Sequence, residues 1–355
     1  MSVLDAARAL AEGAPVLVSD GGGDGEPDFV FAGELAGPKT VAFAVRHGSG
    51  FVCAAMTHSE LQRLDIPPMV GMDRASRQDV RVSVDAINGT TTGISAQDRA
   101  KTIRCLSDPA GVAGDFTRPG HVVPMAGHPA GLLGKRGSIE AAVDLTRIAD
   151  LRPVAGVCRA VDEAGNSMRR DVVELFAREH GLAVVSVSEI LEHRLATEDL
   201  VIEDSPMAEI ESEGGRLWSQ TFRDSIGGAE IAVLRGGPLD GRPLVHVHAE
   251  CLVGDLFGHA GCRCRTSLDS AMDRIRTAGG VLVYCRTPNR SATAHLYRAA
   301  ACGREPVEVN WPAVQVLRHI GVGSIRLLTD VAGEVDAWRR AGLDVEQEDL
   351  CAVPG

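Results

Sequence analysis

Three cysteines in the last third of the chain have a spacing that can support metal chemistry. Cys251, Cys262 and Cys264 form a C-x10-C-x-C pattern. Three thiolates are a good ligand set for zinc, and zinc with three protein ligands keeps a fourth position for water, as catalytic zinc sites do. Zinc-bound water supplies hydroxide near neutral pH, which suits attack on an electron-poor ring carbon. The spacing alone leaves two interpretations open: a catalytic zinc site, or three unrelated cysteines in a chain that has nine.

A second group of candidate residues lies near the N-terminus, where the chain reads SDGGGDGEPD from residue 19 to residue 28. Its carboxylates, Asp20, Asp24, Glu26 and Asp28, are hard oxygen ligands of the kind that Mg²⁺ prefers. The same composition is typical of a solvated turn, because glycine-rich acidic stretches between strands are usually loops. The solvated turn is the favoured interpretation.

The segment around the cysteines, HVHAECLVGDLFGHAGCRC, resembles the zinc segment of the GTP cyclohydrolase II family, in which Glu-Cys, Gly-Asp-x-Phe-Gly and Cys-x-Cys follow in this order. The similarity continues through FRDSIGGAEIAVLRG, GGVLVYCR and SIRLLTD and covers roughly residues 203 to 346. It implies a domain that holds Zn²⁺ through Cys251, Cys262 and Cys264. It also implies that Glu250 orients a ligand from outside the coordination shell.

The substrate-binding part of that resemblance is incomplete. Where the family has Arg-Gln-Glu-Gly-Arg-Gly-Ile-Gly-Leu, this chain reads RTPNRSAT from Arg286 onward. Arg286 and Arg290 match the two family arginines, which implies that they bind the anionic part of a ligand. Pro288 replaces the glutamate, and a loop with a catalytic Asp and Arg is missing between Asn310 and Trp311. We therefore predict that the standard ring opening of GTP is lost, which leaves hydrolysis of another ring as the enzymatic hypothesis.

Long runs in the first half resemble 3,4-dihydroxy-2-butanone 4-phosphate synthase, among them TVAFAVRHGSGFVCAAMT, TTGISAQDRAKTIR and RPGHVVPMAGHPAGLL, within roughly residues 3 to 200. Glu26 and Asp28 are retained from the family's acidic segment. Asp24 replaces a metal-binding Glu, Ser138 replaces a metal-binding His, and Arg159 replaces a catalytic Glu. These replacements predict a degenerate synthase site without synthase activity, and they argue against Mg²⁺ as a cofactor.

The elements that must position these residues alternate between strand-like and helical patterns, which favours α/β or α+β architecture. We expect strands at PVLVSD, DFVFAG, TVAFAVRH, LWSQTFRD, AEIAVLRG, PLVHVHAEC and VLVYCR. Helices are expected over SAQDRAKTIRCL and SIEAAVDLTRIA, each capped by its initial serine, Ser95 or Ser138. An acidic stretch near residues 196 to 212 marks a boundary. We therefore predict a synthase-like α/β domain over residues 1–200 and a cyclohydrolase-like α+β domain over residues 201–355.

The overall composition limits the partners and the location. The chain has 355 residues, of which 45% are hydrophobic and 24% charged, as in soluble globular proteins. A formal charge of −12 argues against a nucleic-acid partner, which requires clustered Lys and Arg. No run approaches the roughly 18 apolar residues of a membrane span, and the start, MSVLDAARALAEGAPV, lacks the pattern of a signal peptide. We expect a cytoplasmic protein with no membrane partner.

Three functional hypotheses are compatible with these residues. The first is a zinc-dependent, cyclohydrolase-type hydrolase that opens a cyclic amidine in a GTP-related nucleotide or heterocycle, with the synthase-like domain as a scaffold. The second is a catalytically inactive paralogue with a binding or assembly role. The third is an active riboflavin-pathway enzyme whose replacements are compensated. The expected ligand is a nucleotide, a heterocycle or a sugar-phosphate-like molecule, and by family analogy the chain forms a homodimer or assembles with an active homologue.

Overall fold

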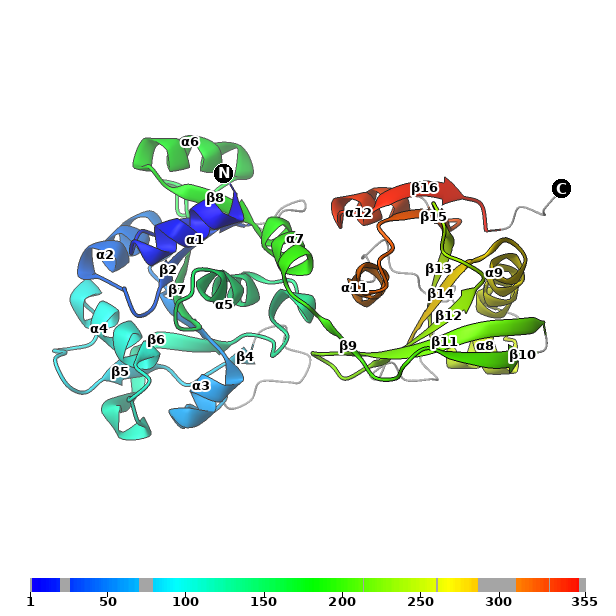
Figure 1. Cartoon of the computed structure of the whole chain (residues 1–355). Coiled ribbons are helices and arrows are strands. Elements are labelled where there is room, and N and C mark those ends of the chain that lie inside the picture. Colours follow the sequence, from blue (N-terminus) through cyan, green and yellow to red (C-terminus); the bar gives the residue numbers. More distant parts are fainter. Residues whose placement is uncertain are drawn as a thin grey trace. The chain divides into compact units, whose positions relative to one another are not determined.

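The computed structural model describes residues 2–19, 26–69, 79–212, 214–259, 261–286, 311–331 and 333–350. Contacts divide the chain into two units, Met1–His193 and Arg194–Gly355, which run from blue to green and from green to red in Figure 1. The first unit is α/β and the second is α+β, so the predicted two-domain fold class is confirmed. Within the described ranges, no helix is long and apolar enough to cross a membrane.

The first unit is built on a mixed sheet whose central strands are buried on both faces. Every residue of β2 and β3 is buried, which is the pattern of a sheet covered by helices on two sides. The strand order is β4-β6-β3-β7-β2-β1-β8, and β5 pairs with β6. The strands are β1 (Val16–Ser19), β2 (Asp28–Ala32), β3 (Cys53–Met56), β4 (Asp79–Val80), β5 (Val84–Ala86), β6 (Phe116–Ala126), β7 (Val154–Arg159) and β8 (Ala183–Ser186).

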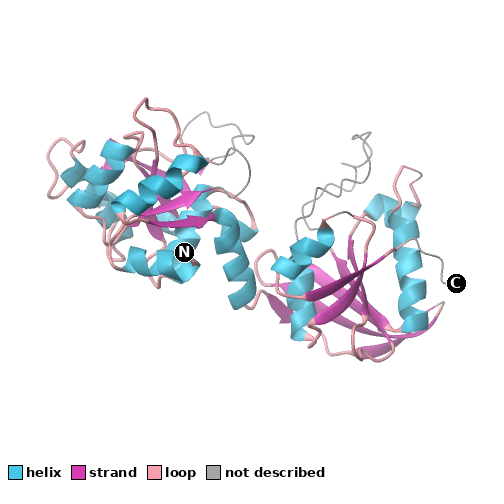
Figure 2. Ribbon diagram, turned by 90° about the horizontal axis from the view of Figure 1, so that it is seen from above, coloured by secondary structure: helices cyan, strands magenta, loops and turns pink. Residues whose placement is uncertain are grey.

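Helices cover both faces of this sheet (Figure 2). They are α1 (Val3–Ala11), α2 (Pro38–His47), α3 (His58–Arg63), α4 (Ala96–Ser107), α5 (Ser138–Ile148), α6 (Arg170–His180) and α7 (Val187–Thr197), with 3-10 helices η1 (Ala113–Asp115) and η2 (Gly131–Leu133). Helices α2 and α4 pack against the face that carries Phe29 and Phe31. Helix α5 contacts β1, β2, β3 and β7 from the other face and also contacts α1.

Two local predictions in this unit were wrong. The run TVAFAVRH is not a strand but part of α2, in which Val41 and Ala44 are buried at helical spacing. Pro38 stands at the start of this helix, where its missing N–H is not needed. Ser95 caps α4 as predicted, with Asp98 N donating to its Oγ at 3.0 Å. Ser138, however, is the first residue inside α5, and Gly137 occupies the cap position.

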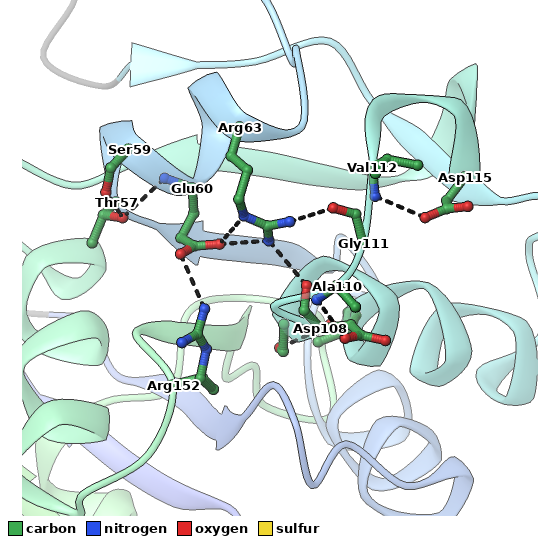
Figure 3. Close-up of polar contacts among 12 residues, drawn as sticks. Thr57, Ser59, Glu60, Arg63, Asp108, Ala110, Gly111, Val112, Asp115 and Arg152 are labelled. Atoms are coloured by element: carbon green, nitrogen blue, oxygen red, sulfur yellow. Dashed lines mark hydrogen bonds and ion pairs between the residues drawn. The ribbon is translucent and has the colours of Figure 1, made fainter.

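A polar network joins α3 to two loops of the first unit (Figure 3). Arg63 donates from Nε to Glu60 Oε2 at 3.0 Å and from Nη2 to the Asp108 carbonyl at 3.0 Å, and its Nη1 reaches the Gly111 carbonyl. Those carbonyls follow the end of α4, where backbone acceptors have no helical partner. Arg152, just before β7, donates to the second oxygen of Glu60 at 3.2 Å. Arg63 and Glu60 therefore fix α3 against the end of α4 and the start of β7.

We expect Arg63→Ala to lower the free energy of unfolding of the first unit by about 1–3 kcal/mol, because it leaves several half-buried acceptors without their donor. Urea denaturation followed by circular dichroism measures the change. Arg8→Ala is the matched control, since Arg8 is 70% exposed and its ion pair with Asp5, at 3.6 Å, lies in solvent. Equal midpoints for the two variants would show that the network adds no stability.

Two histidines are packed among phenylalanines where α2 meets α6. The His47 ring lies 4.6 Å from Phe43 and 5.0 Å from His180, and His180 lies 4.2 Å from Phe176, measured between ring centroids. Partial burial lowers the pKa of His47 below 6.5, and His180 and Arg46 lower it further. His47 is therefore neutral in the folded protein over a pH range in which the unfolded chain already binds a proton.

This depressed pKa predicts that the first unit loses stability in mildly acidic solution. At pH values well above 7, His47 is unprotonated in both states, so its contribution is constant. As the pH falls below 6.5, the unfolded state binds the proton first and gains stability relative to the folded state. Melting temperatures measured between pH 7.5 and pH 5 should therefore fall less steeply for His47→Leu than for the wild type. Parallel curves would contradict this assignment.

The second unit contains one mixed sheet with an antiparallel and a parallel half. Its strand order is β10-β11-β12-β14-β13-β15-β16, and β9 pairs with β11. Pairing is antiparallel from β10 to β14 and parallel from β14 to β16. The strands are β9 (Val201–Glu203), β10 (Ala208–Ser212), β11 (Gly215–Asp224), β12 (Glu230–Gly236), β13 (Leu244–Ala249), β14 (Gly280–Cys285), β15 (Ser324–Leu328) and β16 (Asp344–Glu348).

Helices also cover this second sheet on both faces. They are α8 (Leu252–Phe257), α9 (Cys264–Ala278), α11 (Trp311–His319) and α12 (Glu334–Arg340). Alternate residues of β14 point to opposite faces. Val281 and Val283 join the core cluster that contains α11, whereas Leu282 joins the cluster that contains α9 (Figure 1). Cys264 is the first residue of α9, the helix that packs on the face of the sheet that carries Leu282.

Candidate functional site

Two segments that carry predicted site residues leave the second sheet at the same edge. Strands β13 and β14 are parallel neighbours with Ala249 opposite Cys285, and Glu250 N donates to the Cys285 carbonyl at 2.9 Å. Cys251 therefore follows one strand where Arg286 follows the other. The carboxyl edge of parallel strands is the usual place for a binding site in α/β sheets. The fold thus brings the cysteine segment and Arg286 to one edge.

The three cysteines predicted to bind zinc converge at this edge. The Sγ atoms of Cys251, Cys262 and Cys264 lie within 4.8 Å of one another. Cys251 is buried, and the other two thiols are half-buried. Zn–S bonds of about 2.3 Å in a tetrahedron place sulfurs about 3.8 Å apart, so this donor set fits zinc after small side-chain movements. Cys264 begins the 15-residue helix α9, whose N-terminal partial charge favours an anionic sulfur ligand.

Gly254 makes the close approach of these thiols possible. A Cβ atom at this position would lie 2.5 Å from Cys262 Sγ and 2.9 Å from Cys251 Sγ, which is shorter than any normal contact. The glycine of the Gly-Asp pair in the motif is therefore required by the packing of the sulfurs. No other side chain can occupy this position without moving a thiol.

Asp255 is a buried acceptor directly behind the cysteines. Its Oδ2 accepts from Cys251 N at 2.9 Å and from Tyr284 Oη at 2.8 Å, and its Oδ1 lies 3.0 Å from His248 Nε2. Both His248 and Asp255 are nearly inaccessible, with side chains 3% and 6% exposed. Three elements, β13, α8 and β14, are thereby joined at one carboxylate. This arrangement fixes the backbone of Cys251 and hence the direction of its thiol.

Tyr284 and His248 complete this buried network. Their rings are stacked with centroids 5.4 Å apart and an interplanar angle of 17°. Burial raises the pKa of Tyr284, and the hydrogen bond to the Asp255 carboxylate raises it further. The phenol therefore stays protonated and donates. Asp255 and Tyr284 were not predicted as site residues, although the Gly-Asp pair of the motif was a signal for the first of them.

The predicted anion-binding arginines have different outcomes. Arg290 lies outside the described residues, as does the segment from 287 to 310 in which the Asp-x-Arg loop is predicted to be missing. Arg286 is about half-exposed and lies between two carboxylates, with Nε 3.5 Å from Glu250 and Nη1 3.8 Å from Glu230. Glu250 was predicted to orient a zinc ligand. Its ion pair with Arg286 and the position of Asp255 make Asp255 the stronger candidate for that role.

Glu26 and Asp28 of the first unit meet Arg159 where β2 begins and β7 ends. Arg159 Nε lies 2.8 Å from Asp28 Oδ1, and its Nη1 pairs with Glu26. The structure therefore brings together three of the predicted degenerate-site residues. Asp24 and Asp20 lie outside the described residues. Ser138 begins α5, a different element, and offers a hydroxyl group where an imidazole was expected.

The loop that precedes Ser138 is anchored on buried acids of α5. Glu140 is 1% exposed, accepts a hydrogen bond from His128 N at 3.0 Å and pairs with Lys135 Nζ at 3.3 Å. Asp144, equally buried, accepts from Leu132 N at 2.8 Å. These contacts hold Lys135 beside the N-terminus of α5. This anchoring role was not predicted from the sequence, because it depends on contacts across a loop.

Two further groups in the first unit are close to the synthase-like motifs. Asp85 and His121 form a hydrogen-bonded pair with 2.7 Å between Oδ2 and Nδ1, and the backbone of Gly93 packs tightly against both. Cys53 is buried at the start of β3. Burial raises the pKa of its thiol to about 12, with smaller contributions from Cys158 and Asp28. Cys53 is therefore a thiol at neutral pH and not an activated nucleophile.

Comparison with known proteins agrees with the order of the two units. The family described as 3,4-dihydroxy-2-butanone 4-phosphate synthase matches residues 4–193, and the family described as GTP cyclohydrolase II matches residues 203–349. A riboflavin biosynthesis protein RibBA from Salinispora tropica is 39% identical over 95% of this chain and 88% of its own length.

Two solved structures resemble the chain, one over nearly its whole length and one over about half of it. RibBX, a two-domain 3,4-dihydroxy-2-butanone 4-phosphate synthase from A. baumannii, superimposes with a TM-score of 0.80 at 26% identity and covers 98% of this chain and 99% of its own. A 3,4-dihydroxy-2-butanone 4-phosphate synthase in complex with two magnesium ions covers 56% of this chain and 98% of its own, with a TM-score of 0.54 and 36% identity.

Proposed function

Because this chain belongs to the family of bifunctional riboflavin-biosynthesis proteins, in which a 3,4-dihydroxy-2-butanone 4-phosphate synthase domain precedes a GTP cyclohydrolase II domain, we propose that its second unit is a zinc-dependent hydrolase. The substrate is a nucleotide or heterocycle related to GTP, and the first unit serves as a scaffold. The observation that carries this proposal is the convergence of Cys251, Cys262 and Cys264 within 4.8 Å at a sheet edge.

The residues around the thiols suit catalytic zinc better than purely structural zinc. Three protein ligands leave one position for water, and zinc supplies Lewis-acid and hydroxide chemistry there. The described part of the chain contributes the three thiols, and Asp255 holds the Cys251 backbone so that its sulfur points toward the other two. Protonated Tyr284 donates to the same oxygen of Asp255 and keeps the carboxylate oriented. These roles are those of residues that orient metal ligands.

Arg286 is proposed to bind the anionic part of the substrate, together with Arg290. Glu230 and Glu250 pair with Arg286 at 3.8 and 3.5 Å, and the arginine side chain is about half-exposed. Exposed ion pairs of this kind contribute at most about 1 kcal/mol. A phosphate or carboxylate can displace them, because a guanidinium binds such groups through two parallel hydrogen bonds. Arg286 is therefore available to a ligand despite its neighbours.

Two alternatives are each supported by a specific observation. An inactive paralogue with a binding or assembly role, as a homodimer or with an active homologue, is supported by the pairing of Arg159 with Glu26 and Asp28. An active riboflavin-pathway enzyme is supported by 39% identity to a protein named for riboflavin biosynthesis. The two-domain protein from A. baumannii, which covers 98% of this chain, is named for synthase activity alone, and that name favours synthase activity over a scaffold role for the first unit.

Turnover by the zinc-loaded full chain separates these possibilities. The protein is incubated with GTP and with a panel of purine nucleotides and related heterocycles, and ring-opened products and formate are followed by mass spectrometry. The proposal predicts hydrolysis of at least one panel member and little or none of GTP. Robust conversion of GTP would restore the riboflavin-pathway assignment. No turnover of any compound by protein that holds zinc would support the inactive paralogue.

A further inference from the structure

The register of two strands in the first unit places opposite charges face to face. Strands β2 and β7 are antiparallel, and Asp28 lies directly opposite Arg159. Side chains in that relation have Cβ atoms about 5 Å apart. The guanidinium meets the Asp28 carboxylate through two contacts, 2.8 Å from Nε and 3.4 Å from Nη2, while Nη1 pairs with Glu26. One arginine therefore neutralises two carboxylates, those of Glu26 and Asp28, which are two positions apart in the sequence.

Asp28 requires a counter-charge because it is only 3% exposed. A buried carboxylate without a partner is strongly destabilising, so such groups are paired with a cation or coordinate a metal ion. A carboxylate at position 159 would face Asp28 with a like charge and would need an added cation between them. An arginine at this position supplies the cation covalently. The described residues thus satisfy Asp28 without any bound ion.

The same contacts make this site unsuitable for magnesium, which the family implies and which one related synthase structure contains. A divalent ion needs several carboxylate oxygens at short range and its remaining ligands as water. Here oxygens of Glu26 and Asp28 are already engaged by guanidinium N–H groups. A divalent ion at these oxygens would also be repelled by the adjacent positive charge. Ser138 offers a hydroxyl in place of the expected imidazole ligand.

We infer that Arg159 is the resident cation of the synthase-like site and that it has replaced the divalent metal ion. The first unit therefore folds and holds Glu26 and Asp28 without magnesium. Converting Arg159 to a carboxylate should create a divalent-cation site that the natural chain lacks. This inference concerns the first unit alone and does not depend on the zinc chemistry proposed for the second.

The test uses Mn²⁺ as the probe and the full-length, zinc-loaded protein, so that the thiols are already occupied. Free Mn²⁺ is measured by electron paramagnetic resonance during titration of wild type, Arg159→Glu, Arg159→Gln and the control Arg8→Glu. We expect no saturable binding by the wild type or by Arg8→Glu, which makes the same charge change on an exposed helix. Arg159→Glu should bind Mn²⁺ at least about tenfold more tightly than the wild type does, because a carboxylate that attracts the ion replaces a guanidinium that repels it. Arg159→Gln should lie between them.

A melting-temperature measurement keeps the test informative if Arg159→Glu folds poorly. Mg²⁺ should leave the melting temperature of the wild type unchanged and raise that of Arg159→Gln, whose Asp28 has lost its counter-charge. Saturable, submillimolar Mn²⁺ binding by the wild type, unchanged or weakened in Arg159→Gln, would overturn the inference. A Mg²⁺-dependent rise in the melting temperature of the wild type would do the same.

Discussion

Replacing Cys262 by serine is expected to remove zinc from the protein. Wild-type protein should contain about one zinc per chain, and Cys262→Ser should contain close to none after brief chelation. A serine hydroxyl is a far weaker zinc ligand than a thiolate, so the loss in affinity should exceed the roughly 10–100-fold that changes outside the coordination shell produce. Any zinc-dependent hydrolysis should fall in parallel. Elemental analysis and a chromogenic chelator competition measure the metal.

The matched control for this variant is Cys105→Ser, which makes the same chemical change at another half-buried thiol, on α4. Circular dichroism should show that both variants remain folded, because Cys262 is absent from the described core clusters of the second unit and Cys105 is only half-buried at the core of the first. Equal zinc content in the two serine variants would show that the convergence of the thiols does not reflect a metal site.

Asp255→Asn is expected to weaken zinc binding by about 10–100-fold while all three thiols remain. The carboxylate accepts hydrogen bonds from Cys251 N and Tyr284 Oη through one oxygen, and its other oxygen lies 3.0 Å from His248 Nε2. An amide carries no negative charge and has only one oxygen, so it cannot serve as the acceptor for all three groups. The thiol of Cys251 should therefore lose its fixed direction. Zinc dissociation constants from chelator competition give the change directly.

Two further variants separate this effect from a general loss of charge. Tyr284→Phe removes one donor and should weaken zinc binding less than Asp255→Asn does. Asp269→Asn removes an exposed carboxylate on α9 that pairs with Arg265 at 3.0 Å, and should leave zinc affinity unchanged. If Asp255→Asn bound zinc as tightly as Asp269→Asn, the network behind the cysteines would have no role in positioning them.

The cysteine cluster was predictable because its signals are local in sequence. The Cys-x-Cys pair and the Gly-Asp-x-Phe-Gly segment lie within 14 residues of Cys251, and their thiols meet within 4.8 Å. The strands β11 to β14 were also predictable from their apolar patterns. The contacts of Asp255 with Tyr284 were not, because they depend on the parallel pairing of β13 with β14.

The Arg159 ion pairs illustrate a second limit of sequence reasoning. The replacement at position 159 was evident, but its partner Asp28 is 131 residues away in sequence. Only the register of β2 against β7 shows that the two side chains face each other. The sequence therefore indicated loss of a catalytic acid, whereas the structure shows that the arginine pairs with two carboxylates. The helix α2 was missed because the continuous apolar run at residues 41–45 also fits a buried strand.

Zinc K-edge X-ray absorption spectroscopy on the wild-type protein, combined with elemental analysis, determines whether the three thiols bind zinc and leave one position open. We expect one zinc per chain with three sulfur neighbours at about 2.3 Å and one oxygen or nitrogen neighbour at about 2.0 Å. That result would establish a coordination sphere with a position open to water. Four sulfur neighbours would indicate closed, structural zinc, and absence of zinc from protein purified with the metal would contradict the account altogether.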